Sequence, residues 1–126
     1  MGGRDLPGGE TSSNVWSSLD GIEWTLEGEA GWSPRVCHGY AVFRGRIWIM
    51  GGVSDWKRDN QETLKNDIWF TADGRDWTEV KCAKTWSRRH QPATYVFRDR
   101  IWIAGGHAEP VNSEVWSWQP PQEWSF

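Results

Sequence analysis

Apolar residues occur along the chain in short runs that favour β-strands rather than helices. The runs are rich in β-branched and aromatic residues and are bounded by Gly, Asp, Asn or Pro. They lie at 15–19, 40–43, 46–50, 68–72, 94–97, 100–104 and 114–118. No stretch shows the 3.6-residue period of an amphipathic helix. We therefore expect an all-β protein with almost no helix.

Dipeptides between the runs predict the turns. Asp20-Gly21 and Asp73-Gly74 each predict a two-residue hairpin turn, because Gly accepts a positive φ and Asp tolerates one. Arg44-Gly45 and Arg98-Asp99 predict similar turns between neighbouring runs. Residues 47–50, Ile-Trp-Ile-Met, do not alternate with polar residues, so this strand is expected to be buried on both faces.

The sequence contains an internal repeat. Residues 46–52, Arg-Ile-Trp-Ile-Met-Gly-Gly, recur 54 positions later at 100–106 with one substitution. The similarity extends over 31–52 and 85–106, where each copy also carries Trp-Ser-x-Arg. A fixed period of this length indicates stacked structural units.

A second repeated element contains two tryptophans eight positions apart and occurs three times. The pairs are Trp16 and Trp24, Trp69 and Trp77, and Trp116 and Trp124. Each pair is predicted to lie on one hairpin. With two-residue turns, the two rings of a pair should point to opposite faces of the sheet.

The order of these motifs resembles the kelch repeat. Arg-x-x-His at 35–38 precedes the run at 40–43, and Ile-Trp-Ile-Met-Gly-Gly, Asn-Asp-Ile-Trp at 66–69 and Asp-Gly-x-x-Trp at 73–77 follow. The version with tryptophan in every strand is similar to galactose-oxidase-like kelch domains. This resemblance implies four-stranded antiparallel blades of a β-propeller.

The second unit departs from the kelch pattern at three places. Pro92 stands where the first unit has His38, and Ser113-Glu114 replaces Asn66-Asp67. Pro120-Pro121 replaces the Asp-Gly turn, and since proline cannot supply a positive φ, the last hairpin must turn differently.

The resemblance divides the chain into four parts. We expect a flexible tail at 1–13, the outer hairpin of an incomplete blade at 14–28, and kelch blades at 34–80 and 86–126. Propellers close with about 4–8 blades, so these strands make a partial β-propeller of kelch type. The chain is expected to be an opening segment of a longer propeller or a shortened relative of one. Its exposed apolar end faces should drive self-association unless missing blades cover them.

Structural roles in the repeat fall to the tryptophans, the glycine pairs and one turn. Most of the tryptophans are expected to pack between blades, with Trp48 and Trp102 in equivalent core positions. The structural residues are Trp16, Trp24, Trp48, Gly51, Gly52, Trp69, Asp73, Gly74, Trp77, Trp102, Gly105, Gly106, Trp116 and Trp124.

Ligand-binding candidates come from the loops that alternating strands bring to one face. In kelch proteins the equivalent loops commonly bind the partner, so the resemblance points to this face. Alternatively, Arg35 and Arg89 bind backbone carbonyls of the neighbouring blade, and Trp56 is a lid over the blade edge. The candidates are Trp32, Arg35, Trp56, Arg58, Trp86, Arg89 and His107.

Composition limits the other possibilities. The chain has 126 residues, twelve of them Trp, and a net charge of −3 with acids and bases interspersed, which argues against a nucleic-acid surface. No apolar run reaches the length of a membrane span, and residues 1–13 contain no apolar signal region, so the compartment stays open. Cys37 and Cys82 are expected to be free thiols.

No catalytic or metal-binding pattern emerges from the sequence. His38, His90 and His107 share no ligand spacing. The tyrosines and histidines occupy repeat positions rather than those of a copper-radical oxidase, and Asp-Gly-x-x-Trp is one residue shorter than the sialidase Asp-box. We therefore expect no cofactor and no enzymatic activity, but a binding or scaffold module for a protein or carbohydrate ligand. The alternative is a fragment of a carbohydrate-active propeller enzyme, oxidase- or sialidase-like.

Overall fold

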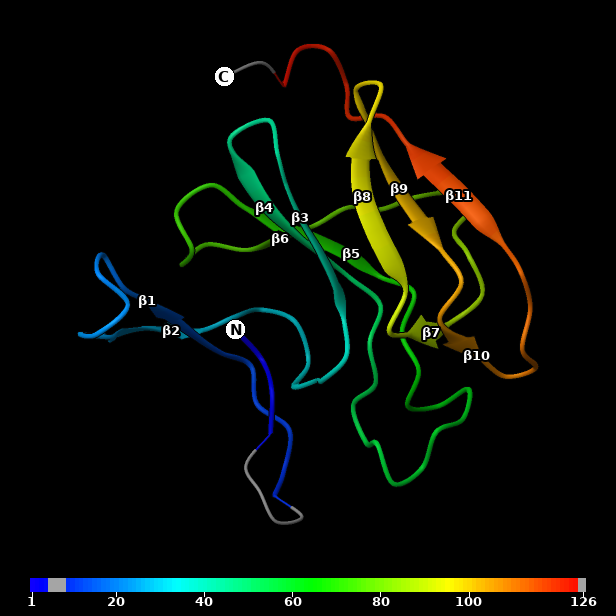
Figure 1. The fold of residues 1–126 in the computed structure, drawn as a ribbon, viewed down its shortest axis with the longest axis horizontal. Helices are drawn as coiled ribbons and strands as arrows, with labels where there is room; N and C mark the ends of the chain where they lie inside the picture. The colour runs from blue at the N-terminus through cyan, green and yellow to red at the C-terminus, as the bar shows by residue number, and fades with distance from the viewer. Residues whose placement is uncertain (5–8, 125–126) are drawn as a thin grey trace.

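The computed structural model describes residues 1–4 and 9–124, and over these ranges the protein is all-β (Figure 1). Its strands form antiparallel sheets, none of which closes on itself. No described segment is a helix of the length and apolarity needed to cross a bilayer. The strands are β1 (Asn14–Ser17), β2 (Thr25–Glu29), β3 (Gly39–Phe43), β4 (Arg46–Met50), β5 (Ile68–Thr71), β6 (Thr78–Glu79), β7 (Arg89–His90), β8 (Ala93–Phe97), β9 (Arg100–Ala104), β10 (His107–Ala108) and β11 (Val115–Trp118).

Three sheets follow one another along the chain, and each predicted apolar run lies in one of them. Strands β1 and β2 form a hairpin, β3-β4-β5-β6 a four-stranded sheet, and β8-β9-β11 a three-stranded sheet. A short ribbon of β7 and β10 is separate from these. The fourth strand predicted at the end of the second unit is not formed in the described residues, because Pro120-Pro121 begins a turn that Trp124 N–H closes onto the Pro121 carbonyl at 3.1 Å.

The turns at Arg44-Gly45 and Arg98-Asp99 are confirmed as two-residue hairpins. Phe43 pairs with Arg46 and Phe97 with Arg100, and all four turn residues have positive φ. The turns also meet, since Arg44 Nη2 lies 2.5 Å from Asp99 Oδ2. Two sheets that are far apart in sequence are therefore tied together at their tips.

The prediction of two-residue turns at the Asp-Gly sequences is wrong. Ser17 pairs with Thr25, so the first loop spans 18–24. Ser18 Oγ accepts the Gly21 N–H at 2.7 Å, and Asp20 Oδ1 accepts the Ile22 and Glu23 N–H groups. Side-chain acceptors thus hold a wider loop than two residues would make.

The second Asp-Gly loop, 72–77, has the same construction. Thr71 Oγ1 accepts the Gly74 N–H, and Asp73 Oδ1 accepts the Arg75 and Asp76 N–H groups, each at 2.9 Å. These backbone hydrogen bonds lower the pKa of Asp73 from its ordinary value.

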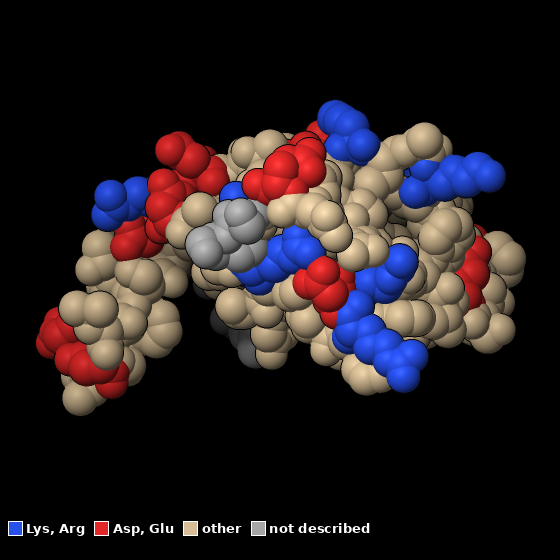
Figure 2. Space-filling view, turned by 90° about the horizontal axis from the view of Figure 1, so that it is seen from above, with Lys and Arg blue, Asp and Glu red and all other residues tan. Residues whose placement is uncertain are grey.

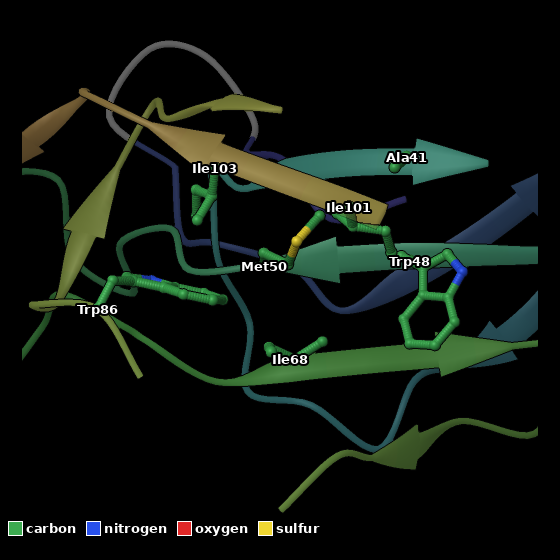
Figure 3. Close-up of a cluster of buried hydrophobic side chains, with 7 residues drawn as sticks. All are labelled: Ala41, Trp48, Met50, Ile68, Trp86, Ile101 and Ile103. Carbon is green, nitrogen blue, oxygen red and sulfur yellow. The ribbon is translucent and has the colours of Figure 1, made fainter. Parts of the chain in front are cut away.

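Strand β4 of the four-stranded sheet is buried on both faces, as its apolar run predicted. On one face it packs against the three-stranded sheet through a cluster that includes Trp48, Met50, Ile101 and Ile103 (Figure 3). On the other face Ile49 packs with Val15 of the hairpin. Consecutive residues of β4 point to opposite sides, so one strand contributes to both clusters.

Two tryptophans eight positions apart, one on β5 and one at the end of the 72–77 loop, also pack between the sheets. Trp69 and Trp77 both lie against the cluster of Val15, Trp32 and Ile49, so the two rings are on the same face. The expectation of opposite faces is therefore wrong for this pair, because it depended on the two-residue turn. In the next layer Trp124 takes a similar place beside Trp48, although no strand carries it.

Residues at both ends of the tail predicted for 1–13 make hydrogen bonds to the rest of the chain. Gly2 N–H donates to the Asn14 carbonyl at 3.0 Å and Gly3 N–H to the Arg35 carbonyl at 3.0 Å. Arg4 forms a bridge with Thr11, whose hydroxyl donates to the Ser54 carbonyl. Residues 5–8 of this prediction lie outside the described residues.

Candidate functional site

Loops and short strands gather at one end of the molecule. The loop of residues 53–67, the β7-β10 ribbon and the N-terminal segment all lie at the lower end in Figure 1. The tips of the β3-β4 and β8-β9 hairpins and the segment that follows β11 lie at the upper end. Seen from that upper end, Lys and Arg side chains stand beside Asp and Glu rather than in one broad patch (Figure 2).

Four of the seven predicted ligand residues are buried. Trp32 and Trp86 are packed into the two clusters between the sheets, and Arg35 and Arg89 are each only 1% exposed. Their side chains are occupied by contacts within the protein. The exposed members of the predicted set are therefore Trp56, Arg58 and, in part, His107.

Arg35 braces the chain around the first Gly-Gly pair. Its Nε donates to the Ser33 carbonyl at 3.0 Å, and Nη1 donates to the Gly51 carbonyl at 2.9 Å. Nη1 and Nη2 also bind the two oxygens of Asp67 at 2.6 and 2.8 Å. Gly51 has a φ of 64°, and a Cβ there would lie 2.7 Å from the Arg89 carbonyl oxygen, so the position requires glycine.

Arg89 repeats this arrangement in the second unit. It donates to the carbonyls of Ser87 at 3.0 Å and Gly105 at 2.7 Å, and to Glu114 at 2.7 Å. Both arginines thus bind carbonyls of their own repeat unit rather than those of the neighbouring unit. The contacts explain why Trp-Ser-x-Arg, Gly-Gly and an acid recur together in the sequence.

Asp67 and Glu114, the acids that bind the two arginines, are held ionised. Burial by itself raises the pKa of Asp67, but the hydrogen bonds and charge of Arg35 and the Trp69 indole N–H outweigh it, so the pKa lies below its ordinary value. The Ser87 backbone N–H makes the largest contribution to lowering the pKa of Glu114. Both acids are therefore ionised near neutral pH.

Trp56 lies beside an open groove of about 450 Å³ at the loop end. The groove is lined by Gly9, Glu10, Thr11, Pro34, Ser54, Asp55, Trp56 and Lys57. The guanidinium of Arg4 lies 3.7 Å from the centre of the Trp56 ring, and the ring is 42% exposed. Arg58 is exposed nearby and pairs with Asp55 at 3.4 Å. An aromatic face with charged neighbours in an open groove suits a sugar or a peptide.

A second cluster at this end brings together residues that are distant in sequence. His90 Nε2 lies 2.8 Å and His107 Nε2 3.2 Å from the same oxygen, Asp59 Oδ2. The two imidazole rings are stacked with their centroids 5.2 Å apart, and Glu109 Oε2 lies 3.6 Å from His107 Nε2. The donor atoms of Asp59, His90 and His107 lie within 4.8 Å of one another, close enough to share a metal ion.

Sequence spacing missed this cluster, but the repeat contained a signal. The 54-residue offset that aligns the two units places His90 on Val36 and His107 on Val53. Val36 and Val53 bridge each other, just as His90 pairs with His107. The third histidine, His38, is not part of the cluster, and burial, followed by the charge of Arg35, lowers its pKa to about 4.

Both cysteines are free thiols, as expected. Cys37 is exposed, and burial raises the pKa of Cys82.

No protein-family model matches the sequence, and no curated protein matches it.

Proposed function

We propose that this chain is an arc of a kelch-type β-propeller that acts as a non-catalytic binding or scaffold module. Three antiparallel sheets stacked in chain order, with aromatic clusters between them, support the propeller interpretation. The inner strands β3 and β8 lie next to each other, and Thr94 Oγ1 donates to the Tyr40 carbonyl at 2.7 Å. Adjacent first strands are what neighbouring blades place near a propeller axis.

The observation that carries the binding proposal is the half-exposed Trp56 at the open groove. Most tryptophans of the strand repeat pack against the clusters between the sheets. Trp56 instead belongs to a loop that the second unit lacks. Loops on a rigid scaffold commonly carry binding residues. The mixed lining of apolar, acidic and basic groups favours a carbohydrate or a peptide as ligand.

Replacing Trp56 by alanine is expected to change the free energy of unfolding by less than about 0.5–1 kcal/mol, because the ring is held at the surface by Arg4. Binding detected on glycan and peptide arrays should fall about tenfold or more, since a central aromatic side chain commonly contributes over 1 kcal/mol. Trp24→Ala is the matched control, because Trp24 is 57% exposed in the distant 18–24 loop.

Two results would contradict the binding proposal. In the first, Trp56→Ala binds the arrays as strongly as the wild type, whereas Trp24→Ala no longer binds them. The other is turnover of a sugar by the chain alone in oxidase, lyase or glycosidase assays, which would favour the carbohydrate-active enzyme instead.

Uncovered apolar side chains lie on the outermost sheet and on β3 of the four-stranded sheet. Tyr95 pairs with Trp102 and Phe97 with Arg100, so these side chains share the face of β8-β9-β11 that points away from the core cluster. On β3, Tyr40 and Val42 are 67% and 73% exposed, because the β1-β2 hairpin packs on β4 and β5 instead. An apolar sheet face of this kind favours association.

We therefore expect the chain to self-associate at concentrations of about 10–100 µM, as measured by sedimentation velocity. The double substitution Tyr40→Lys and Phe97→Lys should shift the distribution towards monomer, because charge on an exposed strand opposes pairing. Val111→Lys is the control, since Val111 is 71% exposed in a loop outside the sheets. A wild-type chain that stays monomeric throughout this range would contradict the expectation.

A further inference from the structure

The cluster of Asp59, His90 and His107 joins two parts of the protein. Asp59 belongs to the 53–67 loop of the four-stranded sheet, whereas the histidines lie on β7 and β10 beside the second repeat unit. Because β7 and β10 pair His90 directly with His107, both rings project from the same face of the ribbon. Each ring then points Nε2 at the Asp59 carboxylate.

The distances resemble those of a metal site. Zinc binds imidazole nitrogen at about 2.0–2.1 Å and carboxylate oxygen at about 2.0–2.2 Å, so tetrahedral geometry separates neighbouring donor atoms by about 3.3 Å. The two nitrogen–oxygen separations here are 2.8 and 3.2 Å. Small side-chain movements therefore suffice to place one ion among the three donors.

Hydrogen bonding alone satisfies this cluster poorly. Within the described residues, the other carboxylate oxygen, Asp59 Oδ1, is buried without a hydrogen-bond partner, as is His90 Nδ1. Two stacked imidazoles, with ring centroids 5.2 Å apart, also share a single acceptor atom, Asp59 Oδ2. A divalent cation would bind one nitrogen of each neutral imidazole and would balance the negative charge of the Asp59 carboxylate.

Comparison of the repeat units supports a specific role for the histidines. The equivalent pair in the first unit, Val36 and Val53, is buried with Leu64 in a small apolar cluster. In the second unit both positions are histidine, and the loop of the first unit supplies the acid that meets them. Two matched replacements that converge on one carboxylate favour a ligand role over a packing role.

We propose that Asp59, His90 and His107 bind a divalent first-row transition-metal ion, of which zinc fits the donor set well. Two imidazoles and a carboxylate suit zinc, cobalt and nickel rather than calcium or magnesium, which prefer oxygen donors. Glu109, 3.6 Å from His107, or a water molecule completes the coordination. The ion fastens the 53–67 loop to the β7-β10 ribbon and so links the two repeat units. This inference is independent of the binding function proposed for the groove at Trp56.

The test is a titration of the full chain, freed of metal by a chelator, with zinc chloride in competition with a chromophoric chelator. We expect one zinc per chain, with a dissociation constant in the micromolar range or below. His90→Ala and Asp59→Asn should each weaken binding about 100-fold or more, because each removes a ligand. Asp76→Asn is the matched control, since Asp76 is exposed in the distant 72–77 loop, and should bind zinc like the wild type.

Two further measurements separate a defined site from weak surface binding. Cobalt(II) should give the intense visible absorption of a tetrahedral site in the wild type and lose it in Asp59→Asn. At zinc concentrations about one hundred times the dissociation constant, the melting temperature should rise by roughly 10 °C. Absence of saturable zinc binding, or equal affinity in the wild type and in folded Asp59→Asn, would overturn the proposal.

Discussion

Trp48→Ala is expected to lower the free energy of unfolding by about 3–5 kcal/mol, measured by urea denaturation. Trp48 is 0% exposed between the four-stranded and three-stranded sheets. Its ring lies 5.0 Å from Phe70 and 5.1 Å from Trp118, centroid to centroid, and its indole N–H donates to the Phe43 carbonyl at 2.9 Å. Alanine would leave a cavity lined by aromatic rings. The cavity cannot close, because backbone hydrogen bonds hold the surrounding strands in place.

The repeat provides an internal control at Trp102. This residue has the same place in the repeated heptapeptide, and its indole N–H makes the same 2.9 Å bond to a carbonyl, that of Phe97. Trp102 is only half-buried, on the outer face of its sheet. Trp102→Ala should therefore cost about 1–2 kcal/mol, less than the equal core role in the sequence prediction implied. Equal losses in the two variants would contradict the assignment of Trp48 to the interior.

Asp67→Asn should destabilise the protein by about 3–5 kcal/mol at neutral pH, as measured by urea denaturation. Asp67 accepts two hydrogen bonds from Arg35, whose side chain is 1% exposed. Removing the carboxylate charge leaves the guanidinium buried without its counter-ion. The effect should be large for this reason, although the intact ion pair need not itself add much stability.

The cost of Asp67→Asn should depend on pH. Because the pKa of Asp67 in the folded protein lies below its ordinary value of 3.8, the ionised group favours the folded state above that value. This contribution is lost as pH falls below 3.8 through the lower pKa of the folded state. Wild type and variant should therefore converge in stability as the solution is acidified from about pH 4 downwards.

Glu114→Gln is the matched substitution in the second repeat unit. It should cost less than Asp67→Asn, because Arg89 donates one hydrogen bond to the Glu114 carboxylate, whereas Arg35 donates two to that of Asp67. If the difference in free energy of unfolding between the wild type and Asp67→Asn stayed constant from pH 7 to 3, it would contradict the proposal that ionised Asp67 stabilises the folded state.

Several elements of the fold could be predicted from sequence because they depend on neighbouring residues. The strand runs and the turns at 44–45 and 98–99 follow from local propensity and from φ preferences. The Asp-Gly loops could not be predicted as easily, because Ser18, Thr71 and the two aspartates bind backbone N–H groups that the dipeptide does not reveal. The prediction of a last strand in the second unit was wrong, because Pro120-Pro121 redirects the chain.

The candidate sites show the same division. The loop aromatic Trp56 was found from sequence, because a Trp outside the strand repeat stands out. Trp32 and Trp86 are buried although they were candidates for the ligand face, because strand order predicts which end of a sheet a residue occupies but not how deeply it is packed. For Arg35 and Arg89 the structural alternative is closer, although each binds carbonyls of its own unit rather than those of the neighbouring blade. Their burial depends on the neighbouring sheet and on the acids that bind the arginines.

The sequence by itself determined an all-β chain with a repeated unit, paired glycines and a strand buried on both faces. These properties arise from backbone preferences and from side-chain periodicity within a few residues. Only the tertiary structure decided that His90 and His107 meet Asp59, and that Trp48 and Trp102 differ in burial. Contacts between residues 31 or more positions apart depend on how sheets pack, and that packing is a property of the whole chain.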